Sequence, residues 1–161
     1  MSRIAEANGY ALRQVSISGL RFTSEKQVFD ALALPSARTL LVFDIRGARA
    51  RIEALPWIES ARISRVFPDG LDVQLVERKP AAVLSAGASH LVVDANARPL
   101  AGVGPGSMPG LPRIAAEDAQ AAAALLSALA VHPALLARLR SAERQGGRWV
   151  LHIHDGASLR L

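Results

Sequence analysis

Two strand-like stretches joined by a short turn, residues 58–66 and 71–77, constrain the fold of this chain more than any other feature. In the second stretch apolar residues alternate with polar ones, which is the pattern of a strand with one buried face. The residues between the stretches, Phe-Pro-Asp-Gly, have the composition of a tight turn. The sequence therefore predicts a β-hairpin whose apolar face must pack against other elements.

The residues before this hairpin predict one strand and two helices. Apolar and polar residues alternate over residues 12–17, and a glycine follows. Ser24 and Gln27 have the spacing of a helix capping box, and Asp44 is the predicted N-cap of a second helix. The order strand, helix, helix, strand, strand predicts an α+β domain in which two antiparallel helices cover one face of a three-stranded sheet.

The pattern changes at Pro80, after which a second, β-rich region is predicted. We expect a glycine- and proline-rich loop over 102–112, short strands at 82–84, 90–93 and 98–100, helices at 116–130 and 133–139, and a final hairpin of 148–154 with 157–161. The predicted organisation is a tail over residues 1–8, a first domain over 9–79, and a partial mixed β domain over 80–161.

The composition excludes some classes of partner. The chain has 161 residues, of which 50% are hydrophobic, enough for one large or two small cores. Its net charge of +5 raises the question of nucleic acid, but the arginines are scattered and only 4% of residues are aromatic. Nucleic-acid sites gather their charges into a stripe and stack bases on aromatic rings. We therefore predict no nucleic-acid partner, although the charge is compatible with an anionic membrane nearby.

Residues that could carry chemistry do not form a recognisable site. The chain has no cysteine, no Gly-x-Ser-x-Gly motif and no phosphate-binding glycine loop. His152 and His154 could supply half of a metal site on one side of a strand, but the sequence offers no third ligand that completes it. We predict no catalytic residue, no metal and no cofactor.

The apolar stretches of the chain are far shorter than the roughly 20 residues that cross a bilayer, and its first 12 residues are too polar for a signal sequence. The expectation is that this chain by itself is soluble.

Four sequence segments resemble one known family. Residues 55–84, "LPWIESARISRVFPDGLDVQLVERKPAAVL", resemble the signature of the POTRA domain of the bacterial FtsQ/DivIB cell-division proteins. "VSISGLRFTSEKQVFDAL" is similar to the first strand and helix of that domain. Further on, "HLVVDANARPL" and "RWVLHIHDGASLRL" resemble the start and two later strands of the family's second, β domain.

The resemblance implies a non-enzymatic scaffold on the periplasmic side of the bacterial inner membrane, at the division septum. Members of the family bind FtsB and FtsL and help to regulate septal peptidoglycan synthesis. They carry a cytoplasmic tail and a transmembrane helix before the POTRA domain, and a further helix and strand after the last strands seen here. This chain is therefore expected to be a fragment that contacts the membrane only through a helix that it lacks.

The resemblance also suggests partner-binding residues. Glu77 matches a glutamate at the junction of the family's two domains, and Arg78 follows it in the same charged run. Arg144 and Arg148 correspond to arginines near the partner-binding face. The alternative for all four is an ordinary solvated surface.

Two other functions stay open at this point. A POTRA module of an outer-membrane assembly or secretion factor would bind unfolded β-strands, but such modules are followed by further POTRA repeats or by a barrel. The third candidate function is that of an enzyme, such as a hydrolase.

Three side chains test the predicted register and packing. Ile63 is predicted to point into the core and Arg62 away from it, because neighbours on a strand face opposite sides. Trp57 is either a recognition residue or a seal at the core edge, and the seal is the preferred reading. Trp149 is predicted to belong to the second core.

Overall fold

In the computed structural model, residues 14–34, 43–115 and 119–161 are described. The chain divides into two compact units, residues 1–78 and 79–161. Each unit pairs a β-sheet with helices, which confirms the predicted α+β class. Among the described residues, no helix has the length and apolar character needed to cross a membrane.

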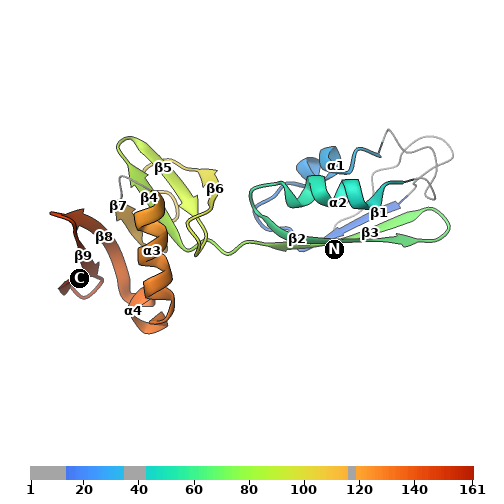
Figure 1. Cartoon of the computed structure of the whole chain (residues 1–161). Coiled ribbons are helices and arrows are strands. Elements are labelled where there is room, and N and C mark those ends of the chain that lie inside the picture. The colour runs from blue at the N-terminus through green and yellow to red at the C-terminus, as the bar shows by residue number, and fades with distance from the viewer. Residues whose placement is uncertain (1–13, 35–42, 116–118) are drawn as a thin grey trace. The chain divides into compact units, whose positions relative to one another are not determined.

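The first unit is a three-stranded sheet covered on one face by two helices (Figure 1). The order of its elements is the predicted one: β1 (Gln14–Ser18), α1 (Glu25–Leu32), α2 (Ile45–Glu53), β2 (Ile58–Val66) and β3 (Gly70–Glu77). β3 lies in the middle, with β1 parallel and β2 antiparallel to it. The predicted hairpin is β2 and β3.

Both helices of this unit begin at the predicted caps. Ser24 accepts the backbone N–H of Gln27, whose side chain accepts the Ser24 N–H in return. Asp44 accepts the N–H of Gly47 at 3.0 Å. Arg51 on α2 donates to the carbonyl oxygens of Ala31 and Leu32, which satisfies acceptors that the end of α1 leaves without helical partners.

The apolar faces of these helices and of the sheet form the first core. Ile63 is in this core and the neighbouring Arg62 is exposed, so the predicted register is confirmed. The core consists of Val15, Ile17, Val28, Leu32, Phe43, Ala48, Ile52, Ile58, Ala61, Ile63, Leu71, Val73 and Leu75.

The outer edge of β2 is partly covered by a side chain of α2. The Glu53 carboxylate accepts the N–H of Ala61 at 3.0 Å and also pairs with Arg49. The pKa of Glu53 is lowered chiefly by the hydrogen bond from Arg49, and then by that from Ala61. This contact occupies a donor that would otherwise be open to another strand.

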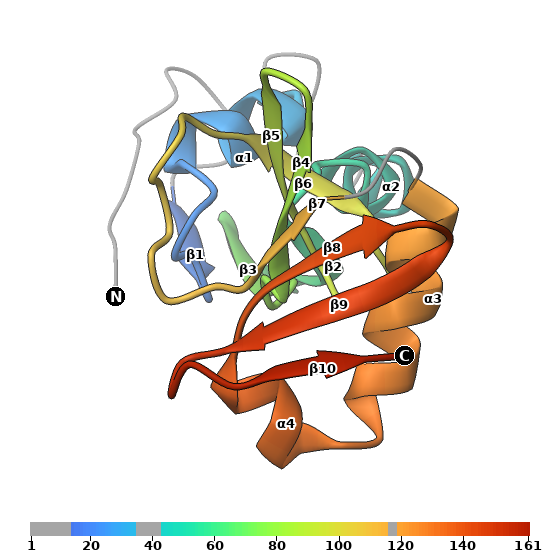
Figure 2. The ribbon, with the colours of Figure 1, turned by 90° about the vertical axis from the view of Figure 1, so that its left-hand side faces the viewer.

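The second unit is a seven-stranded mixed sheet with the order β10-β9-β8-β7-β4-β5-β6 (Figure 2). Its elements are β4 (Ala82–Ala86), β5 (Ser89–Val93), β6 (Pro99–Gly102), β7 (Arg113–Ala115), α3 (Ala119–Ala130), α4 (Pro133–Arg138), β8 (Leu139–Gln145), β9 (Arg148–Ile153) and β10 (Ser158–Arg160). β7 pairs in parallel with both β4 and β8. A parallel pair needs a crossover, which α3 and α4 provide between β7 and β8.

β7 and β8 were not predicted, and α4 ends at Arg138, one residue before the end of the predicted helix 133–139. Only one residue of β7 is buried. β8 contains few apolar residues, and an irregularity between Leu139 and Ser141 breaks its alternation. The first three residues of the predicted helix 116–130 lie outside the described residues, and its remainder is α3.

The second core lies between this sheet and α3. Trp149 packs against it while remaining partly exposed, in agreement with its predicted place. The core residues are Ala82, Leu84, Val93, Ala97, Ile114, Ala122, Leu125, Leu126, Leu129, Leu139, Ala142, Leu151 and Ile153.

Candidate functional site

Glu77 lies at the end of β3 and binds the loop that leads from β1 into α1. Its carboxylate accepts backbone N–H groups from three successive residues: Arg21 at 3.1 Å, Phe22 at 2.9 Å and Thr23 at 2.7 Å. Burial acts to raise the pKa of Glu77, but these hydrogen bonds outweigh it, so the pKa lies below its ordinary value. The carboxylate is therefore held in its charged form as part of the fold.

An aromatic pair lies next to this loop. Phe22 stacks on Trp57 with ring centroids 4.3 Å apart and an angle of 19° between the rings. The Arg21 guanidinium carbon lies 5.1 Å from the centre of the Phe22 ring, within the range of a cation–π contact. The Trp57 ring is thus half-buried against the β1–α1 loop. The described side chains that pack against the first core do not include Trp57, so its role as a seal at the core edge stays a prediction.

Arg78 follows Glu77 directly. Its backbone N–H donates to the carbonyl of Trp57 at 2.7 Å, which continues the pairing of β2 with β3 by one residue. The structure therefore brings Glu77 and Arg78 together with the aromatic pair.

The outer edge of β10 is a second candidate surface. β10 is the last strand of the sheet and pairs only with β9 among the described strands. Leu161 and Trp149 exchange two backbone hydrogen bonds, of 2.9 and 3.2 Å. In an antiparallel ladder, hydrogen-bonded pairs of residues alternate with pairs that are not hydrogen-bonded. The N–H and C=O groups of Arg160 and Ser158 therefore point away from β9. These groups form an open edge that another strand can pair with.

Apolar side chains accompany this edge. Leu159 and Leu161 are 43% and 62% exposed. Leu159 is in register with the buried Leu151, so it points to the helix-covered face at the margin of the core. The arrangement combines backbone groups that have no strand partner among the described residues with apolar side chains, the two features that strand addition uses.

Arg144 and Arg148 lie on adjacent strands, at the end of the β8–β9 hairpin where two glycines make the turn. Both are exposed. Arg144 is in register with Trp149 and Arg148 with Gln145. The alternation of side chains then directs the two arginines to opposite faces of the sheet.

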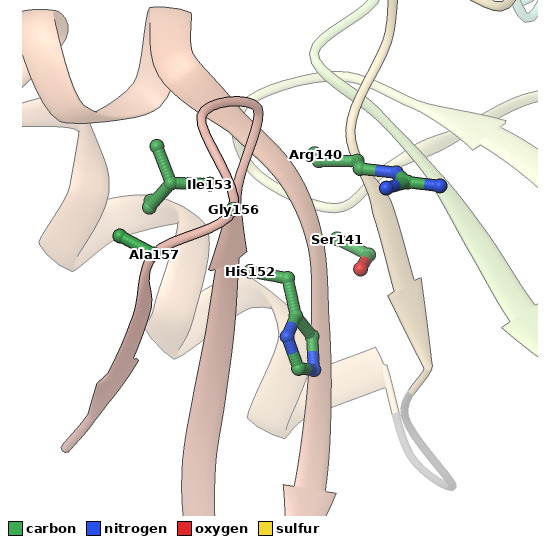
Figure 3. A pocket seen from close by; sticks show the side chains of 6 residues that line it. All are labelled: Arg140, Ser141, His152, Ile153, Gly156 and Ala157. Carbon is green, nitrogen blue, oxygen red and sulfur yellow. The ribbon is translucent and has the colours of Figure 1, made fainter.

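His152 lies in a small pocket on the face away from α3 (Figure 3). The pocket has a volume of about 230 Å³ and is lined by Arg140, Ser141, His152, Ile153, Gly156 and Ala157. The His152 ring contacts Ser158 at 3.1 Å and Glu143 at 3.4 Å. Within the described part of the chain, no three potential metal-ligating side chains gather at one point.

Comparisons with known proteins place the chain among cell-division proteins. Residues 10–78 match the family model described as "POTRA domain, FtsQ-type". The chain is 32% identical over 157 residues to the cell division protein FtsQ of Agrobacterium fabrum, covering 96% of this chain and 50% of that protein. It is 31% identical over 141 residues to the FtsQ protein of Rhizobium radiobacter, covering 86% of this chain and 67% of that protein.

The chain spans about half the length of the Agrobacterium fabrum protein and of the FtsQ proteins of Rhizobium meliloti and Bartonella bacilliformis. A solved structure of the major extracytoplasmic domain of the cell division protein DivIB from Geobacillus stearothermophilus superposes with a TM-score of 0.45 at 19% identity. That superposition covers 53% of this chain and 78% of the DivIB chain.

Proposed function

Because the chain belongs to the FtsQ family of bacterial cell-division proteins, we propose that it is a non-enzymatic scaffold that binds other division proteins at the septum. It acts on the periplasmic side of the inner membrane, as part of a longer protein tethered by a transmembrane helix. Its partners are proteins of the FtsB and FtsL type, and through them it helps to regulate septal peptidoglycan synthesis.

The open edge of β10 carries this proposal. The outward backbone groups of Ser158 and Arg160 provide main-chain hydrogen bonds for an added strand, and Leu159 and Leu161 provide apolar contacts beside it. In the proposed arrangement, the strand that follows this chain in the whole protein extends the sheet from β10, and the partner's strand joins the extended sheet. Affinity then comes from backbone pairing, and specificity comes from the side chains.

We propose that Arg144 or Arg148 also contacts the partner; because their side chains point to opposite faces of the sheet, one partner segment contacts only one of them. Their positive charges lie on two strands of the same sheet as β10 and favour a partner segment that carries acidic residues.

Glu77 and Arg78 belong to a separate proposed contact on the first domain. Glu77 holds the loop that carries Arg21 and Phe22, so its effect on a partner is exerted through the shape of this loop. Replacement of Glu77 by lysine in the whole protein should weaken recruitment of a partner that binds the first domain and leave FtsB binding by the second domain intact.

A proline at position 160 tests the β10 edge. Arg160→Pro removes a backbone N–H that points away from β9, so the β9–β10 pairing is retained while the outer edge loses a donor. The matched control, Arg160→Ala, removes the side chain and keeps the N–H. We expect the full-length Arg160→Pro protein to lose capture of FtsB from cells and the alanine variant to retain it. Equal capture by the two folded variants would exclude pairing at this edge.

A further inference from the structure

The tip of the β2–β3 hairpin exposes two adjacent apolar side chains. Val66 is 53% exposed and Phe67 is 70% exposed. The other aromatic side chains of the described residues are packed: Phe22 and Trp57 stack on each other, Phe29 and Phe43 join the first core, and Trp149 joins the second. Phe67 is therefore the exception among the described aromatic residues, and it does not contribute to either core.

The exposed face of the same sheet is otherwise mainly polar, which confines the apolar surface to the tip. Ser64 and Arg62 precede it on β2, and Asp72 and Gln74 follow on β3. Val76, the other exposed apolar residue of this sheet, lies at the opposite end of β3. The sheet face as a whole is thus no apolar docking surface, and the apolar contact is limited to the turn.

The tip lies at the end of the three-stranded sheet where β1 begins. β1 runs parallel to β3, and Gln14 is in register with Gly70 at the start of β3. The backbone N–H of Gln14 also donates to the carbonyl of Asp69 in the turn, at 3.4 Å. The start of β1 therefore lies at the same end of the sheet as Val66 and Phe67, with β3 between them.

The shape and size of this apolar surface favour a lipid layer over a protein as its occupant. Specific protein interfaces bury roughly 800 Å² on each partner, whereas a turn with two apolar side chains offers only a small, convex contact. A bilayer accepts a small apolar protrusion without a complementary pocket, and aromatic rings are favoured at its interface. Arg65 precedes Val66, but its guanidinium donates to the Phe43 carbonyl at 3.0 Å, so the proposed contact is made by the two apolar side chains.

In contrast to the expectation from the sequence that only a transmembrane helix contacts the membrane, we propose that Val66 and Phe67 form a membrane-contacting tip that inserts into the outer leaflet of the membrane to which the whole protein is tethered. This inference rests on the proposed function, because the tether brings the tip to the lipid surface. The tether raises the local concentration of the tip, so a contact of low intrinsic affinity is sufficient. Insertion of the tip would orient the first domain relative to the membrane.

A single-cysteine label tests this contact, since the chain has no cysteine of its own. Phe67→Cys and, as a matched control, Glu59→Cys are labelled with an environment-sensitive fluorophore. Glu59 is exposed on the same strand, near the end away from the tip. Each protein is attached through an N-terminal histidine tag to nickel-chelating vesicles of phosphatidylcholine and phosphatidylglycerol. The attached tag takes the place of the tether.

We expect a blue shift and quenching by spin-labelled lipid at position 67, with neither change at position 59. Attachment through a C-terminal tag should reduce both changes. An unshifted label at position 67 would overturn the proposal and favour a groove on a partner protein as the binding site of the tip. Equal changes at positions 67 and 59 would also overturn it. Capture of FtsB by the full-length Phe67→Ser protein tests the proposed function separately. We expect this variant to capture FtsB normally, because the proposed FtsB contact does not include the tip.

Discussion

The carboxylate of Glu77 accepts the backbone N–H of Thr23 at 2.7 Å, across a separation of 54 residues in the sequence. Two further N–H groups from the same loop point at this carboxylate. The end of β3 is thereby fixed to the loop that begins α1, and the aromatic pair of Phe22 and Trp57 is held beside it.

This contact predicts that Glu77→Lys destabilises the first domain. Removal of an acceptor that serves three N–H groups should lower the free energy of unfolding by about 2–4 kcal/mol, and Glu77→Gln, which keeps one oxygen, by about half of that. Urea unfolding followed by Trp57 fluorescence in a Trp149→Phe background measures the loss. The matched control is Glu59→Lys, which makes the same charge change at an exposed position of β2 and should change stability by less than about 1 kcal/mol.

The same carboxylate predicts a dependence of stability on pH. The pKa of Glu77 in the folded chain lies below its ordinary value of 4.5, so the unfolded chain takes up the proton first as pH falls. The stabilisation is therefore complete above pH 4.5 and is lost as pH falls through the folded-state pKa. Because Glu53 and Asp155 also have lowered pKa values, the diagnostic quantity is the difference between wild type and Glu77→Gln. That difference should shrink on acidification, and a constant or growing difference would contradict the assigned role.

Neighbouring residues of β2 should respond differently to the same substitution. Ile63→Asp places a charge in the first core and should cost about 3–5 kcal/mol. Arg62→Asp lies on the exposed face and should cost less than about 1 kcal/mol. Urea unfolding of both variants tests this difference, and similar losses would mean that the two faces of β2 are wrongly assigned.

The first domain should fold without the second. Its core is formed by residues between Val15 and Leu75, and its last strand ends at Glu77. A protein of residues 1–80 is expected to melt in one cooperative transition with no binding of the dye ANS. A broad transition with strong ANS binding would show that the first domain depends on the rest of the chain.

The features that the sequence predicted depend on neighbours along the chain. The Ser24 and Asp44 caps, the hairpin of β2 and β3 and the register of Ile63 are set by side chains a few residues apart, and each is present. Such patterns are visible in one sequence because turn chemistry and alternation act locally.

The features that escaped prediction depend on distant pairing. β7 has only three residues and is held by parallel partners from distant parts of the chain, so no local pattern marks it. The interaction of Glu77 with residues 21–23 is equally distant, and in the sequence Glu77 is only one member of a charged run. The family resemblance singled out Glu77, but its structural contacts become visible only in the folded chain.

The central claim, a division scaffold that binds its partner through an extended sheet, is tested most directly by titration of the extracytoplasmic segment of FtsB. Two proteins are compared: the 161-residue chain and the same chain extended to the C-terminus of the whole protein. The extended chain should bind at least about tenfold more tightly, a difference of about 1.4 kcal/mol, because the strand proposed to follow β10 would extend the sheet that the partner joins. Equally tight binding by the 161-residue chain would contradict this claim.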